Sequence, residues 1–108
     1  MGFNPPMIVR IGDIDIAKNN KIEYTLTKYA EGSIGIRGRV PQESDISSIE
    51  DELYRLREGR TQEIEIDYGG SKITGEYKIN ELNWKKERKG DGSYELQFII
   101  GLQRGQFH

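Results

Sequence analysis

Acidic side chains near the N-terminus are the first candidates for chemistry. Asp13 and Asp15 lie two residues apart, and paired carboxylates can bind Ca²⁺ or Mg²⁺ or act in acid–base catalysis. No third ligand follows at the spacing of a calcium-binding loop, so a charged, solvent-facing strand edge is the preferred interpretation. Glu50, Asp51 and Glu52 are consecutive, and consecutive residues point in different directions around a helix. These acidic residues therefore predict no metal site.

Residues for nucleophilic or phosphate chemistry are also poorly placed. The single histidine, His108, is the last residue of the sequence, and there is no cysteine. Histidine-based triads and zinc–thiolate sites are therefore not expected. Gly32, Gly35 and Gly38 are spaced by three, but no helix follows them directly, as a phosphate-binding loop requires. They fit turns and close approach of strands instead. The sequence predicts neither an enzyme nor a bound cofactor.

One aromatic residue lies beside a basic cluster. Trp84 is followed by Lys85, Lys86, Arg88 and Lys89, a combination that can bind single-stranded nucleic acid by base stacking and phosphate contacts. The formal net charge of −2, from 16 basic and 18 acidic residues, is not that of a typical nucleic-acid-binding domain. Trp84 also has the spacing of a core or interface residue. Nucleic acid is therefore disfavoured as a partner, and a binding module is kept as the alternative function.

Two charged rows have opposite sign and matching period. Glu63, Glu65 and Asp67 alternate with apolar residues, as do Arg37 and Arg39, so each set is expected on one face of a strand. Acidic side chains in such a row repel one another unless neighbours compensate. The two rows could pair within one sheet or across a contact between subunits. All five are candidate subunit-contact residues.

A single amphipathic helix must lie between the strands. Its apolar stripe has helical spacing and comprises Ile46, Ile49, Leu53 and Leu56. Ser44 or Asp45 is expected to cap the N-terminus, and Ser47 with Glu50 has capping-box spacing. Gly59 is expected to end the helix in the left-handed conformation.

The remaining chain has the alternation of β-strands. Residues 7–16 indicate a strand pair or a bent strand broken at Gly12-Asp13, and strands are expected before and after the helix, with hairpin turns at Gly69-Gly70 and Gly90-Asp91-Gly92. Apolar parity changes near Asn80-Glu81, which predicts a bulge. The expected fold class is α+β, mainly β: an antiparallel sheet curled around the helix, or a β-sandwich or small barrel with one flanking helix.

Composition and length set the domain organisation. The 108 residues, 34% hydrophobic and 31% charged, are expected to form one domain spanning 1–108, with a flexible lead over 1–6 and a polar tail over 103–108. No apolar run is long enough to cross a membrane, and Met1–Pro6 lacks the layout of a signal peptide. The expected location is the cytoplasm, or a particle assembled there.

The order of motifs resembles a known family. It runs SIGIRGRVP, DISSIE, LYRLREG, DYGGSKITGEY, INELNW and YELQFIIGL over residues 33–102. This pattern is similar to that of the small tail proteins of long-tailed phages (the tube, distal-tail and tail-terminator group) and to components of contractile injection systems. The residues that match the family's rhythm are Gly75, Tyr77, Ile79, Phe98, Ile100 and Leu102.

The resemblance implies a structural role. It implies a virion protein that forms homo-oligomeric rings, usually six-fold, and contacts other tail or baseplate proteins. The first functional hypothesis is therefore a self-associating structural subunit of a phage-type tail or related particle. The alternative is a small-barrel module that binds nucleic acid or protein.

Overall fold

The computed structural model describes residues 8–30, 32–59, 61–67 and 72–104. The expected turn at Gly69-Gly70, the lead over 1–6 and His108 lie outside these ranges. The elements in chain order are β1 (Ile8–Ile11), β2 (Ile14–Asp15), β3 (Glu23–Ala30), β4 (Ser33–Val40), α1 (Glu43–Glu58), β5 (Thr61–Asp67), β6 (Lys72–Arg88) and β7 (Tyr94–Arg104).

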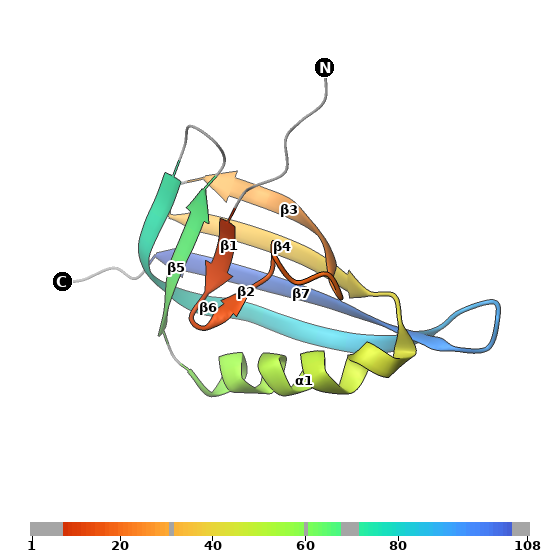
Figure 1. The fold of residues 1–108 in the computed structure, drawn as a ribbon. Coiled ribbons are helices and arrows are strands. Elements are labelled where there is room, and N and C mark those ends of the chain that lie inside the picture. Colours follow the sequence, from red (N-terminus) through yellow and green to blue (C-terminus); the bar gives the residue numbers. More distant parts are fainter. Residues whose placement is uncertain (1–7, 31, 60, 68–71, 105–108) are drawn as a thin grey trace, which may run out of the picture.

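All the strands belong to one antiparallel sheet. Their order is β2-β1-β5-β6-β7-β4-β3, and the sheet curls into a half-barrel with α1 along its inner side (Figure 1). The expected fold class, α+β and mainly β with one helix, is confirmed. Because β2 and β3 lie at opposite ends of the sheet, the segment 16–22 that joins them crosses the open side of the half-barrel. Ile16 and Ile22 on this segment are buried.

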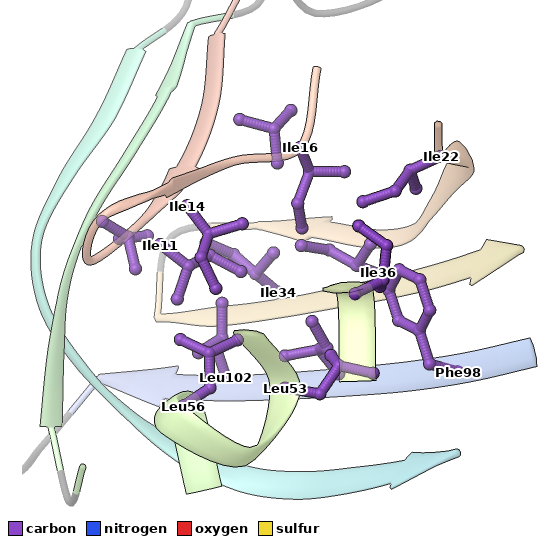
Figure 2. Packing of buried hydrophobic residues seen from close by; sticks show 14 of the residues in the cluster. Ile11, Ile14, Ile16, Ile22, Ile34, Ile36, Leu53, Leu56, Phe98 and Leu102 are labelled. Carbon is purple, nitrogen blue, oxygen red and sulfur yellow. The ribbon is translucent and has the colours of Figure 1, made fainter. Parts of the chain in front are cut away.

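The core forms between the inner face of the sheet and the helix. All four residues of the predicted helical stripe are buried. Figure 2 shows Leu53 and Leu56 facing Phe98 and Leu102 of β7, with Ile16 coming from the crossing segment. Burying such side chains contributes roughly 1.5–3 kcal/mol each, so this contact holds the helix against the sheet.

The predicted changes in strand geometry are present. Gly12, between β1 and β2, has a φ of 58°, a conformation that glycine adopts without strain. In the pairing of β6 with β7 the register shifts between Ile79 and Glu81, where the change of parity predicted a bulge. The turn at Gly90-Asp91-Gly92 connects β6 to β7, and Gly92 has a φ of 91°.

Both predicted helix ends are wrong in detail. The helix begins at Glu43, its N-cap is Gln42, and no side chain caps it. The connection from β4 is so short that Ser44 and Asp45 already lie in the first turn. Instead, the Glu43 carboxylate accepts a 2.8 Å hydrogen bond from the backbone N–H of Tyr94, which ties the helix start to β7.

At the other end, Gly59 is extended, with φ −81° and ψ 136°, because the chain passes straight into β5. Residues 103 and 104, which were expected to begin a polar tail, belong to β7 instead. The backbone N–H of Arg104 donates to the Gly32 carbonyl at 3.0 Å.

Candidate functional site

The candidate subunit-contact residues share the outer face of the sheet, which is the face turned away from α1. In β4 the side chains of Ile34 and Ile36 are buried, whereas Arg37 and Arg39 are exposed. In β5 the buried residues alternate with Glu63, Glu65 and Asp67. Strand alternation thus places each charged row on one face of its strand, as the sequence predicted, and in the folded sheet both rows lie on the outer face.

The two rows do not pair with each other. The order β5-β6-β7-β4 separates them by three strand spacings, roughly 14 Å at about 4.8 Å for each spacing. Each row finds other partners. Arg39 contacts Glu23 at 2.6 Å and Glu95 at 3.7 Å, and the hydrogen bond to Glu23 is the main cause that raises the pKa of Arg39.

Glu65 is held by two cations. Lys72 Nζ lies 3.0 Å from its carboxylate, and Arg10 also forms an ion pair with it. The hydrogen bond from Lys72 is the main cause that lowers the pKa of Glu65, and the charge of Arg10 adds to it. Asp67 lies opposite Lys72 in the register. Glu65 and Arg39 are therefore largely compensated within the chain.

Arg37 and Glu63 differ from these neighbours. Neither forms an ion pair with a described residue. Glu63 lies directly opposite Glu76 in the pairing of β5 with β6, and like charges in this position are destabilising. Charge is thus left uncompensated at two separate places on the outer face, positive on β4 and negative on β5–β6.

A broad hollow lies over the positive part of this face. It has a volume of about 800 Å³ and runs across β3, β4, β7 and β6, with Arg37, Asn83, Lys85 and Ile99 among its lining residues. Its lining combines charged, amide and hydroxyl groups with the apolar and aromatic side chains of Trp84, Phe98 and Ile99. A lining of this kind offers ion-pair and hydrogen-bond partners to another surface.

The aromatic and basic segment is divided between two faces. Alternation along β6 turns Trp84, Lys86 and Arg88 toward the helix side, and Lys85 toward the outer face. The Trp84 ring packs edge-on against Tyr54 at 4.9 Å, with the Arg57 guanidinium 4.4 Å from its centroid. Neither contact was predicted from the sequence. Tyr54 and Arg57 lie one helical turn apart, and each directly follows a residue of the buried stripe, which could have indicated a flank beside β6.

Three of the four cations of this segment also have partners. Lys85 pairs with Glu87 at 2.8 Å, Lys86 lies 3.8 Å from Glu50, and Lys89 Nζ donates to the Pro41 carbonyl at 2.7 Å. The segment therefore does not present the continuous basic strip with open aromatic rings that binds single-stranded nucleic acid.

Among the described residues, two long stretches of strand have no neighbouring strand on one side. β3 lies at an end of the sheet. β5 pairs only with Lys72–Lys78 of the 17-residue strand β6, so the remaining part, 79–88, has a partner strand only on the β7 side. Figure 1 shows this part of β6 as the margin of the sheet nearest the helix. Neither edge was predicted from the sequence. The strand pattern before the expected turn at Gly69-Gly70 is shorter than the pattern after it, and this difference could have indicated the second edge.

The acidic residues near the N-terminus do not gather other ligands. Asp13 lies in the turn between β1 and β2, and Asp15 Oδ1 accepts a hydrogen bond from the Lys18 backbone at 3.3 Å. Within the described ranges, no three histidine or acidic side chains come together as metal ligands. No described helix combines the length and the hydropathy needed to cross a membrane.

The described part of the chain thus combines an outer face of mixed charge with two exposed strand edges. Comparison with family models, curated proteins and solved structures finds no match to this chain.

Proposed function

We propose that the chain is a structural subunit that self-associates into a closed homo-oligomeric ring of a phage-type tail or related particle. The observation that carries the proposal is the open half-barrel, in which β3 and residues 79–88 of β6 form long edges with no partner strand among the described residues. An exposed strand edge is a template for pairing with another chain.

The two edges differ from the blunted edges of many monomeric proteins. The sheet ends in a two-residue strand at β2, and short strands of this kind discourage pairing. β3, by contrast, has eight residues, and the free part of β6 has ten. A subunit with two different complementary surfaces forms head-to-tail contacts, and these close into a ring when the rotation between neighbours allows it.

Charge on the outer face supports the same proposal. Arg37 on β4 and the opposed Glu63 and Glu76 on β5–β6 have no compensating partner among the described residues. Because the sheet curls, these two places face different directions and are available to different neighbours. The assignment to a phage-type tail or related particle rests on the resemblance of the sequence to phage tail proteins. That resemblance suggests six subunits in the ring, contacts with other tail or baseplate proteins, and a location in the virion, or in the cytoplasm during assembly.

The test is the mass of the purified protein in solution. Sedimentation velocity and native mass spectrometry over a range of concentrations should show one defined oligomer, six-fold by the resemblance. Arg37→Glu should weaken the oligomer, and added salt should weaken it as well if the contact is exposed. Lys18→Glu is a matched control, because Lys18 is an exposed lysine in the turn after β2.

A strict monomer at the highest concentration, at low and at moderate salt, would contradict self-association of the isolated chain. That result would favour the alternative, a module that binds another molecule as a monomer. A ring that resists both the charge reversal and added salt would show that charge on the outer face does not hold the contact.

A further inference from the structure

We infer that the free edge of β6 pairs with β3 of a second copy of the chain, so that one sheet continues from subunit to subunit. This inference rests on the proposed self-association and names the contact that would produce it. It follows from three properties of the two edges, which are their direction, their register and their side chains.

The strand directions are compatible. β3 pairs antiparallel with β4, β4 with β7, and β7 with β6. After three antiparallel steps, β6 runs opposite to β3. A second copy in the same orientation therefore brings its β3 antiparallel to the free edge of β6. Four strands is an even number, so the alternation of hydrogen-bonded and non-hydrogen-bonded pairs also continues across the new contact.

Each row of residues paired across β3, β4, β7 and β6 can be continued into the second copy without a shift. This unshifted register predicts which residues of the two copies lie opposite each other. One row runs from Glu23 through Arg39 and Gln97 to Lys85. Continued into the second copy, this row places Glu23 opposite Lys85. The next outer row places Thr25 opposite Asn83.

The irregular positions of the two edges fall in adjacent rows. β3 has an extra residue between Leu26 and Lys28, and β6 has one between Ile79 and Glu81. Both extra residues fall within the same three rows, so each edge is lengthened by one residue over the same distance. In the row between the two extra residues, Lys28 of the second copy lies opposite Glu81, which is a second pair of opposite charge on the outer face.

The inner face of the new contact is apolar. The rows place Tyr24 of the second copy opposite Trp84, and Leu26 opposite Leu82. Trp84 and Leu82 are only partly buried in the single chain. Tyr54, on the same side of the sheet, is 50% exposed and packs against Trp84. Cross-strand aromatic and apolar pairs of this kind stabilise a sheet, and the contact would cover a strip that the single chain leaves exposed.

The charges also select this register over its neighbour. A slip of two residues toward the hairpin tip would place Glu23 of the second copy opposite Glu87. Like charges directly opposite are destabilising, and a slip of one residue would turn the apolar row to the outer face. The unslipped register is therefore favoured over both of these slips, because it pairs opposite charges on the outer face and apolar side chains on the inner face.

The first experiment is disulfide cross-linking, for which the cysteine-free chain is well suited. The substitutions Thr25→Cys and Asn83→Cys are both at exposed positions, and within one chain these positions are three strand spacings apart, roughly 14 Å. A disulfide needs Cα atoms within about 7 Å, so the double variant cannot close the bond within one subunit. Oxidation should give a ladder of covalent oligomers on a non-reducing gel, ending at the number of subunits in the ring. Thr25→Cys with Glu87→Cys is the control out of register and should give no ladder.

A charge exchange provides an independent test. Neither Lys28 nor Glu81 forms an ion pair with a described residue, so their exchange leaves the described ion pairs of the subunit intact. Lys28→Glu alone should weaken association about tenfold, and adding Glu81→Lys should restore it.

The outcomes separate the two proposals. A ladder from the in-register pair, with rescue by the charge exchange, would support the inference. A defined ring by mass, with no ladder and no effect of Lys28→Glu, would overturn the edge contact and leave the proposed function standing. A strict monomer with no ladder would overturn both.

Discussion

The core is tightly packed where Gly38 of β4 meets the ring of Phe98. Gly38 lies opposite Phe98 in the register, and the phenyl ring occupies the place that a side chain at position 38 would need. Phe98 is only 3% exposed, so the ring cannot move outward into solvent. We predict that Gly38→Ala destabilises the fold.

The magnitude follows from the number of ring atoms involved. An added methyl group at position 38 would overlap three atoms of the ring, so either the phenyl ring or the β4 backbone must shift. Forcing extra volume into a packed core costs about 1–3 kcal/mol in the free energy of unfolding. For a domain of this size that corresponds to a fall of about 5–15 °C in Tm.

The assay is thermal and urea unfolding, with Gly90→Ala as the matched control. A methyl group at position 90 would meet no atom within 4 Å, and Gly90 is not among the glycines with positive φ, so the control should change stability by less than about 0.5 kcal/mol. Combining Gly38→Ala with Phe98→Leu should be less destabilising than the sum of the two single changes. Equal Tm values for Gly38→Ala and the unsubstituted protein would refute the packing argument.

Three further outcomes are expected. Leu53→Ala should lower the free energy of unfolding by about 2–5 kcal/mol in urea titrations, because Leu53 is buried and its truncation leaves a cavity; a loss below about 1 kcal/mol would contradict its place in the core. Because the pKa of Glu65 lies below its usual 4.5, its ion pairs stabilise the fold above that pH and lose this effect as the pH falls through the lowered pKa. Glu65→Gln should therefore be less stable than the unsubstituted protein at pH 7, and this difference should shrink at acidic pH; a difference that does not change with pH would contradict the role of the carboxylate. EDTA should leave Tm unchanged, since the described residues bring no three metal ligands together; a fall in Tm that one divalent ion reverses would reveal a site.

The helix shows how far local pattern can lead. Its buried stripe was predicted correctly, because four apolar residues at intervals of three and four can share only one face. Its ends were predicted less well. Capping preferences suggested Ser44 or Asp45, but the short connection after Val40 starts the helix at Glu43. At Gly59 the direct passage into β5 favours an extended conformation over the left-handed one.

The charged rows show that local pattern predicts which way a side chain points but not which residue it pairs with. Alternation predicted that Arg37, Arg39, Glu63 and Glu65 would leave the core, and the structure places them all on the outer face. Alternation did not predict the ion-pair partners of these residues. Arg39 pairs with Glu23 on a neighbouring strand, and Glu65 with Arg10 on another, because the partner of a strand residue depends on strand order and register.

The sequence by itself determined which residues point inward, where the helix lies and where the chain bulges near Asn80, because side-chain direction follows from periods of 2 and 3.6 residues along the chain. Only the tertiary structure decided that β5 covers the first seven residues of β6 and leaves 79–88 as an edge. It also decided that β3 lies at the end of the sheet and that Arg57 stacks over Trp84. These features depend on which segments become neighbours, and that choice is made by burying the whole core at once rather than by any one stretch of residues.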